Sequence, residues 1–205
     1  YLNPIKKNKK LKIETNCHVQ KINFNGNNAE SVTYSRDNRN FSVIAEKEII
    51  LCAGSIGSPH LLQTSGIGEA AKLKNLGINI IKDLNGVGKN LQDHLMFRPV
   101  YKVKNIETLN KKINSVFGKL LIGLEYVFTR KGPMTMGASQ LCGFAKSDPS
   151  KDTPNLQFHI QPISTDKLGG ANLHDFHAFT PTVANIRPTS RGEITINSSD
   201  SRVNP

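Results

Sequence analysis

A continuous apolar run that ends in small residues constrains this chain more than any other feature. Residues 48–53 read Glu-Ile-Ile-Leu-Cys-Ala, and Gly54 and Ser55 follow directly. Such a run is typical of a strand that is buried on both faces of an α/β sheet. Ser58 and Pro59 then predict a helix over residues 58–64, with Ser58 as the N-cap and Pro59 in the first helical position. The stretch therefore predicts a strand, a tight turn and a helix.

This predicted strand–turn–helix unit is a candidate anion site. The first turn of a helix carries unpaired N–H groups and the positive end of the helix dipole. Gly54 allows a ligand to approach the backbone closely, and Ser55 or Ser58 adds a hydroxyl donor. The geometry suits a pyrophosphate. Taken alone, the stretch leaves an alternative open, because many α/β turns with Gly and Ser bind nothing.

The segments around this unit predict two parts of the chain with different secondary structure. Before it, short alternating runs and turn residues predict a small antiparallel meander, with strands at 11–13, 18–24, 31–34 and 41–45. After it come a short helix at 69–76, a strand at 78–81 and a glycine-rich loop at 85–90. Further on, an amphipathic helix is predicted at 113–128, with strands at 99–103, 155–161, 179–186 and 193–196. The boundary between an α/β part and an α+β part is expected near residue 95.

Composition and charge exclude several classes of protein. The net charge is +11, but the lysines between residues 6 and 12 carry no interleaved aromatic residues, so we interpret them as a solvated loop rather than a nucleic-acid surface. No apolar run is long enough to cross a membrane. Three cysteines are too few for a disulfide scaffold, and we expect Cys142 to be buried in a strand. His174 and His177 lack a third ligand, so we expect no metal there.

The motifs, taken in order, resemble those of the glucose–methanol–choline (GMC) flavin oxidoreductases. The segment from Gly54 to Gly68, Gly-Ser-Ile-Gly-Ser-Pro-His-Leu-Leu-Gln-Thr-Ser-Gly-Ile-Gly, is similar to a signature of that family. Residues 86–94, Gly-Val-Gly-Lys-Asn-Leu-Gln-Asp-His, resemble a second family loop. Residues 15–24 resemble its adenine-contacting strand, residues 132–133 its Gly-Pro pair, and residues 187–192 its Pro-x-Ser-x-Gly turn. In its Lys- and Asn-rich style the chain is most similar to insect glucose-dehydrogenase-like members.

The resemblance implies FAD as the cofactor and oxidation of an alcohol or sugar by hydride transfer to the flavin. The implied fold class is α/β with α+β: part of a Rossmann-like FAD-binding domain at 1–95, and part of an antiparallel-sheet substrate-binding domain at 96–205. Val19 would contact adenine through its backbone, and Ala53, Gly54 and Ser55 would lie near the phosphate and ribose. Asn90 and His94 would belong to a loop near the flavin. We expect no nucleic-acid partner and no membrane span.

Two departures from the family pattern bear on activity. The GxGxxG motif that receives the ADP part of FAD and the catalytic His are both absent from these 205 residues. We therefore expect an internal fragment of a longer flavoenzyme, inactive alone. The alternatives are a non-catalytic binding protein with this fold and a truncated product. The sequence contains no targeting signal that would indicate the compartment. The resemblance to insect members implies an extracellular location.

Overall fold

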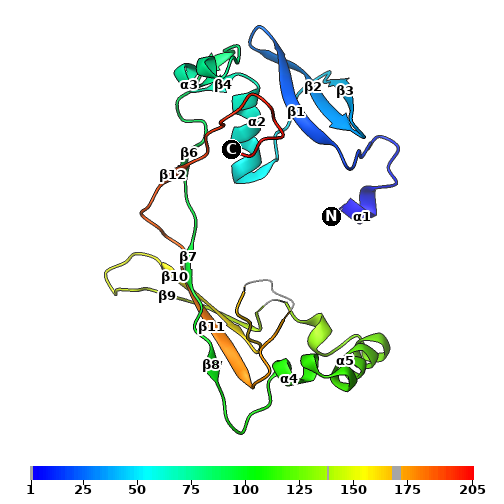
Figure 1. The fold of residues 1–205 in the computed structure, drawn as a ribbon, viewed down its shortest axis with the longest axis vertical. Helices are drawn as coiled ribbons and strands as arrows, with labels where there is room; N and C mark the ends of the chain where they lie inside the picture. The colour runs from blue at the N-terminus through cyan, green and yellow to red at the C-terminus, as the bar shows by residue number, and fades with distance from the viewer. Residues whose placement is uncertain (1, 138, 168–171) are drawn as a thin grey trace. The chain divides into compact units, whose positions relative to one another are not determined.

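The computed structural model describes residues 2–137, 139–167 and 172–205, which form two compact units. The first unit comprises Tyr1–Gln92 together with Ser190–Pro205, and the second comprises Asp93–Thr189 (Figure 1). This division differs from the expected domains at 1–95 and 96–205, because Ser190–Pro205 belong to the first unit. These residues join the first unit because β12 (Gly192–Glu193) pairs antiparallel with β6 (Lys89–Leu91).

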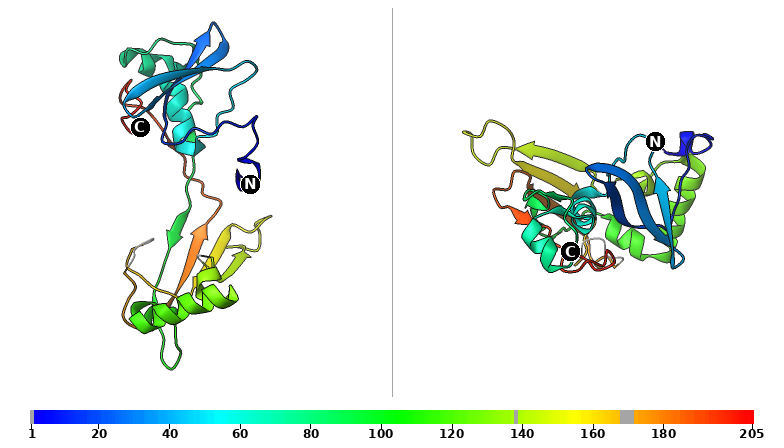
Figure 2. Two further views of the ribbon diagram at one scale, coloured as in Figure 1. Left: turned by 90° about the vertical axis from the view of Figure 1, so that its right-hand side faces the viewer. Right: turned by 90° about the horizontal axis from the view of Figure 1, so that it is seen from above.

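The predicted meander is present in the first unit. Three antiparallel strands follow one another in the order β1-β2-β3: β1 (His18–Asn25), β2 (Asn28–Arg36) and β3 (Arg39–Ile44). Asp37 and Asn38 both take positive φ, 50° and 59°, as a tight two-residue hairpin turn requires. Figure 2 shows this blue sheet from two further directions. The strand expected at 11–13 is wrong: that segment forms none, and α1 (Leu2–Ile5) lies before it.

The helix after the apolar run begins earlier than the sequence predicts. Helix α2 spans Gly54–Thr64, so Pro59 lies inside it and Ser58 is not its N-cap. The Ser58 hydroxyl instead accepts a hydrogen bond from the Ala53 N–H at 3.1 Å. The helix tolerates Pro59 at the loss of one backbone hydrogen bond near its start. At the other end, Gly66 takes a φ of 91° and ends the helix as expected.

The first unit contains a small apolar core. Leu73 of α3 (Ala70–Asn75) packs with Ile78 and with Ile196 from the end of the chain. The strand predicted at 78–81 is wrong, because the strand in this region is β5 (Lys82–Asp83), which pairs parallel with β4 (Ile67–Gly68). Burial of Ile78 in this core explains the apolar pattern that the sequence analysis took for a strand.

The buried strand predicted at 48–53 is also wrong. This segment forms no strand, and the Ile50 side chain is 75% exposed. A parallel strand is stable only when neighbouring strands and covering helices bury both of its faces. Within the described residues the segment pairs with no strand, so Ile50 is exposed, and Ile49 and Leu51 are only partly buried.

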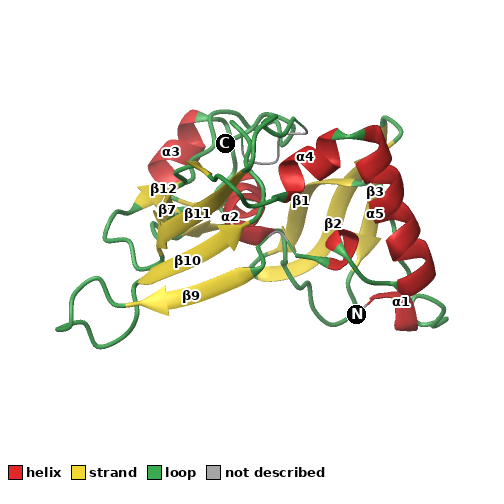
Figure 3. Cartoon of the chain, turned by 90° about the horizontal axis from the view of Figure 1, so that it is seen from below, coloured by secondary structure: helices red, strands yellow, loops and turns green. Residues whose placement is uncertain are grey.

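The second unit is built on an antiparallel sheet. Its strands are β7 (Leu95–Phe97), β8 (Tyr101–Lys102), β9 (Leu141–Ala145), β10 (Leu156–Gln161) and β11 (Ala178–Asn185). The order is β7-β11-β10-β9, and β8 also pairs with β11. Figure 3 shows β9, β10 and β11 as neighbouring arrows. Along β11 every second residue is buried, which indicates that one face of the sheet is covered.

The predicted amphipathic helix is divided in two. Helix α4 spans Leu109–Asn114 and helix α5 spans Val116–Thr129, and the Ser115 hydroxyl between them accepts a hydrogen bond from the Gly118 N–H. A short 3-10 helix, η1 (Pro133–Thr135), follows Gly132. The apolar residues of α5 are exposed, Val116 at 85% and Phe128 at 81%. Cys142 is exposed as well, so the expectation that it is buried is wrong. None of the helices in the described part of the chain is long and apolar enough to span a membrane.

Candidate functional site

The start of α2 presents an open backbone. Gly54 takes a φ of 78°, and a Cβ added at this position would meet nothing within 4 Å. Ala53, Gly54 and Ser55 are all exposed. A glycine with positive φ and free space beside it lets another group approach the main chain closely. The first N–H groups of an eleven-residue helix are therefore accessible at this point.

One cavity lies between the start of α2 and strand β1. It has a volume of about 220 Å³, and its lining includes Val19 from β1 and Ala53, Gly57 and His60 from α2. Two hydroxyl groups at the end of α2 bond to β1, and of these residues Thr64 lines the cavity. The Ile22 N–H donates to Ser65 Oγ at 2.9 Å, and Thr64 Oγ1 donates to the Gln20 carbonyl at 3.4 Å. These hydrogen bonds join α2 to β1.

His60 is the feature of this cavity that sequence reasoning missed. Its Nε2 atom is buried and has no hydrogen-bond partner among the described residues. Burial lowers the pKa of the imidazole, and the nearby His18 lowers it further. His18 is itself engaged, with its Nε2 3.0 Å from Ser201 Oγ. The helical spacing of Gly57, His60, Leu61 and Thr64 was the only signal in the sequence that these residues share a face.

A second cavity, of about 410 Å³, lies on the other side of the α2 start. Its lining includes Ser55 and Pro59 from α2 and Gly88, Asn90 and Gln92 from the glycine-rich loop. Asn90 takes a φ of 64°. The loop is fixed to the returning chain end, because the Ile194 N–H donates to the Gly88 carbonyl at 2.7 Å.

The six predicted cofactor residues therefore divide into groups. Val19 and Ala53 line the smaller cavity, and Ser55 and Asn90 line the larger one. Gly54, the first residue of α2, is in the lining of neither cavity and lies in sequence between Ala53 and Ser55. His94 belongs to the second unit, where its N–H donates to the Asp93 carboxylate at 2.8 Å.

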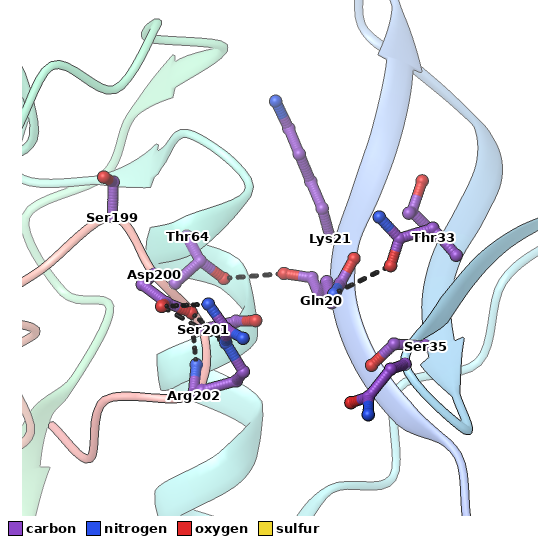
Figure 4. A pocket seen from close by; sticks show the side chains of 11 residues that line it. Gln20, Lys21, Thr33, Ser35, Thr64, Ser199, Asp200, Ser201 and Arg202 are labelled. Atoms are coloured by element: carbon purple, nitrogen blue, oxygen red, sulfur yellow. Dashed lines mark hydrogen bonds and ion pairs between the residues drawn. The ribbon is translucent and has the colours of Figure 1, made fainter.

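A third cavity of the first unit was not predicted. It has a volume of about 520 Å³, is lined mostly by polar side chains, and lies between β1, β2 and the chain end (Figure 4). Arg202 binds the Asp200 carboxylate through both Nε and Nη2, at 2.9 and 2.7 Å. These hydrogen bonds lower the pKa of Asp200 to about 2. The charges of the two side chains offset each other, so the pair offers little to an ionic ligand.

Two histidines of the second unit, His174 and His177, form hydrogen bonds with neighbours within it. His174 Nδ1 lies 3.0 Å from Ser164 Oγ, and its Nε2 lies 2.8 Å from the Asp166 carboxylate. His177 Nδ1 accepts a hydrogen bond from the Thr108 N–H at 3.0 Å. Ser164 is only 1% exposed, so its hydroxyl is not placed to attack a substrate. In the described ranges no group of three or more His, Cys, Asp or Glu side chains is arranged to hold a metal ion.

Comparisons with known proteins decide the family. A family model described as GMC oxidoreductase matches residues 1–96. The oxygen-dependent choline dehydrogenase of Staphylococcus saprophyticus is 37% identical over 206 residues, covering 100% of this chain and 36% of the relative. The enzyme of the same name from Burkholderia multivorans is 35% identical over 205 residues, with the same coverage. The chain belongs to the GMC oxidoreductases. It spans 36% of the length of these relatives.

Solved structures confirm the fold of this GMC chain. An FAD-dependent oxidoreductase from Chaetomium thermophilum superposes with a TM-score of 0.81 at 23% identity, covering 99% of this chain and 41% of that one. Formate oxidase from Aspergillus oryzae superposes with a TM-score of 0.85 at 24% identity, covering 98% and 40%. The predicted fold class, α/β with α+β, is thereby confirmed. The placement among insect members stays a prediction.

FAD is the cofactor of the GMC oxidoreductases, and this chain has features that fit part of it. The open backbone at Gly54 leaves room for a phosphate group beside the helix N-terminus. His60 lines the smaller cavity, and its Nε2 atom is buried without a hydrogen-bond partner among the described residues. Each cavity separately is smaller than, or at the low end of, the roughly 300–1,000 Å³ typical of complete ligand sites, so each suits one portion of a dinucleotide.

Proposed function

We propose that this chain supplies part of the cofactor-binding domain and part of the substrate-binding domain of an FAD-dependent oxidoreductase that acts on an alcohol. The observation that carries the proposal is the open start of α2 between two cavities, with four of the predicted cofactor residues in their walls. When bound, FAD supplies the acceptor for the hydride of the alcohol carbon. The relatives are named choline dehydrogenases, and these names support a small alcohol as the substrate.

In this proposal each predicted residue has a binding role. The backbone of Val19 contacts the adenine, and Ala53, Gly54 and Ser55 lie along the ribose and phosphates. Asn90 and His94 belong to the loop near the flavin. Support for the phosphate position comes from the helix N-terminus, whose unpaired N–H groups and dipole favour an anion. The first unit acts as the cofactor-binding part, and the second unit as the substrate-binding part.

A pair of matched glycine variants tests the cofactor site. Gly54 and Gly77 both have positive φ, 78° and 72°, and both have free space where a Cβ would lie. Gly54→Ala and Gly77→Ala therefore carry similar backbone strain, but only Gly54 adjoins the proposed phosphate position. We expect Gly54→Ala to weaken FAD binding about tenfold or more, measured by flavin fluorescence, and Gly77→Ala to leave it unchanged. Equal affinities for the two variants would contradict the proposed site.

The inactivity of the 205-residue chain is a separate proposal. The apolar segment 48–53 has no strand neighbour here, so the sheet that would hold the cofactor is incomplete in the described part. We expect the chain, mixed with FAD and choline or glucose without oxygen, to leave the flavin absorbance unbleached. Bleaching by either alcohol would show that the chain is active alone. Binding of FAD without reduction in a longer protein that includes this chain would favour the non-catalytic alternative.

A further inference from the structure

The polar cavity between β1, β2 and the chain end has no role in the proposed cofactor site. Its volume of about 520 Å³ falls within the roughly 300–1,000 Å³ that is typical of sites for small molecules. None of the six predicted cofactor residues lines it. Thr64 and Ser201 also line the smaller cavity beside α2, so the two cavities are neighbours within the first unit.

A β-bulge shapes one wall of this polar cavity. The register of β1 against β2 shifts between Val19 and Lys21, which leaves Gln20 as an extra residue in β1. Bulges often redirect a side chain next to a functional site. Here two consecutive residues, Gln20 and Lys21, both line the cavity, and Lys21 pairs across the strands with Thr33, which lines it as well. The bulge therefore places an amide and an ammonium group side by side.

Hydrogen bonds connect the elements that form the cavity. The Thr64 hydroxyl donates to the Gln20 carbonyl at 3.4 Å and so joins α2 to β1. His18 Nε2 lies 3.0 Å from Ser201 Oγ, which joins the chain end to β1. Gln20 Nε2 donates to Asn40 Oδ1 at 3.3 Å and links β1 to β3. The positions of the lining residues are therefore set by contacts between all these elements.

The lining is suited to a ligand that carries several hydroxyl groups. Of its eleven residues, five carry a hydroxyl, three carry an amide and three are charged. Hydroxyl and amide groups offer both donors and acceptors, as a polyol requires. None of the eleven is aromatic or aliphatic, so an apolar ring finds no surface to pack on. The side chains of Ser35, Asn38 and Ser199 make no hydrogen bond within the described residues and are free to bind a ligand.

The charges in the lining favour one anionic group on that ligand. Arg202 is paired with Asp200, at 2.7 Å between Nη2 and Oδ2. Lys21 forms no ion pair in the part of the chain that the structure describes, and Figure 4 shows its side chain extended away from the Asp200–Arg202 pair. An ammonium group forms its strongest hydrogen bonds with a phosphate or a carboxylate. One unpaired cation therefore matches one anionic group.

We propose that this cavity binds a small polyol with one anionic group, either a sugar phosphate or a sugar acid. Lys21 pairs with the anionic group, and Ser35, Asn38 and Ser199 bind the hydroxyls. The two classes of ligand share this chemistry and differ only in the anion. The inference goes beyond the proposed function and does not require it, because it concerns residues other than the six predicted cofactor residues.

Four probes separate the contributions of charge and hydroxyl groups. Glucose 6-phosphate, gluconate, glucose and inorganic phosphate are each added to the 205-residue chain, and the backbone amides are followed by ¹⁵N NMR. We expect glucose 6-phosphate and gluconate to shift the resonances of Lys21, Ser35 and Ser199 and to bind about tenfold more tightly than glucose or phosphate. The His159 amide, in the second unit, is the internal reference. Binding of only one of the two acids supports the proposal and identifies the anion.

Matched variants test whether Lys21 supplies the contact. We expect Lys21→Gln to weaken binding of the charged sugars about tenfold and to leave glucose unchanged, and Lys21→Arg to restore most of the affinity. Lys82→Gln is the control, because Lys82 is also an exposed strand lysine of the first unit but lies outside the lining. Ser35→Ala should weaken all three sugars about threefold, through the loss of one hydroxyl contact.

Several results would overturn the inference. Equal affinity for phosphate and glucose 6-phosphate would show that the hydroxyl groups are not recognised, and equal affinity for glucose would show the same for the anion. Equal weakening by Lys21→Gln and Lys82→Gln would assign the binding to the overall charge of +11. Displacement of glucose 6-phosphate by ADP would assign the cavity to the cofactor.

The fate of this inference is separable from that of the proposed function. If FAD binds and none of the sugars shifts Lys21, Ser35 or Ser199, the inference alone is wrong. If the sugars bind as expected and FAD does not bind, the proposed function alone is wrong.

Discussion

The side chain of Gln63 hydrogen-bonds the backbone of Ile196, 133 positions later in the chain. Gln63 Oε1 accepts from the Ile196 N–H at 3.2 Å, and Gln63 Nε2 donates to the Ile194 carbonyl at 2.9 Å. The amide thus takes the place of a neighbouring strand for these two residues. Gln63 is only 5% exposed, so water does not compete for these bonds.

Replacing Gln63 should destabilise the first unit. Gln63→Leu keeps the volume of the side chain but leaves the Ile196 N–H and the Ile194 carbonyl without their partner. Since each unsatisfied buried group costs about 1–3 kcal/mol, we expect a loss of about 2–4 kcal/mol in the free energy of unfolding by urea. Gln92→Leu is the control, because Gln92 is exposed. Similar urea midpoints for Gln63→Leu and Gln92→Leu would show that the hydrogen bonds of Gln63 do not contribute to stability.

Gly88 and Gly86 in the glycine-rich loop should respond differently to alanine. Gly88 has a φ of 84°, and a Cβ there would collide with the Ile194 carbonyl, whereas a Cβ at Gly86 meets nothing within 4 Å. We expect Gly88→Ala to cost about 3 kcal/mol or more, from strain and displacement of β12. Gly86→Ala should stay within about 0.5 kcal/mol of the unaltered chain. Thermal unfolding followed by circular dichroism measures both.

The Asp200–Arg202 pair should give the chain end a measurable acid response. Hydrogen bonds from Arg202 lower the pKa of Asp200 from 3.8 to about 2. A carboxyl with a depressed folded-state pKa contributes stability above its unfolded value, and this contribution is lost as the pH falls toward 2. In Arg202→Gln we expect carboxyl ¹³C NMR to show an Asp200 pKa that rises toward 3.8 but stays below it, because the backbone N–H of residue 202 still donates to the Asp200 carboxylate at 3.0 Å. Arg98→Gln, in the second unit, is the control and should leave the Asp200 titration unchanged.

The exposed side chains of α5 should bind a hydrophobic dye. Val116, Phe117 and Phe128 are 85%, 68% and 81% exposed, an apolar surface that proteins seldom leave open. We expect the chain to enhance the fluorescence of such a dye, and the triple variant Val116→Ser, Phe117→Ser, Phe128→Ser to reduce it with little change in unfolding. The buried Leu73 is the contrasting position, where Leu73→Ser should lower stability instead. A chain that shows no dye binding at all would contradict this prediction.

Local patterns in the sequence predicted the elements that are stabilised by residues close to one another in sequence. The meander from His18 to Ile44 was predicted because alternation and turn residues together specify a hairpin. The strand predicted at 48–53 was wrong. An apolar run indicates that a segment can be buried in a sheet, but it does not show whether neighbouring strands are there to pair with it. The break at Ser115 was missed because the apolar spacing continues through it unchanged.

The site was predictable to the extent that motifs are contiguous in sequence. Val19, Ala53, Ser55 and Asn90 were expected near a cofactor, and the structure places them in cavity walls. His60 could not be found in this way, because the lack of a partner for one nitrogen is visible only once the neighbours are placed. The large polar cavity was missed for the same reason, since its walls come from strands near residue 20 and from the chain end.

The division of the first unit between two stretches of sequence has a consequence for how the protein is made. A ribosome completes residues 1–92 first, then the 97 residues of the second unit, and only then Ser190–Pro205. During that interval Gln63, Gly88 and Leu73 have no partners from the chain end. The first unit is therefore completed late during synthesis, although it begins first, and until then its residues that contact the chain end stay without those partners.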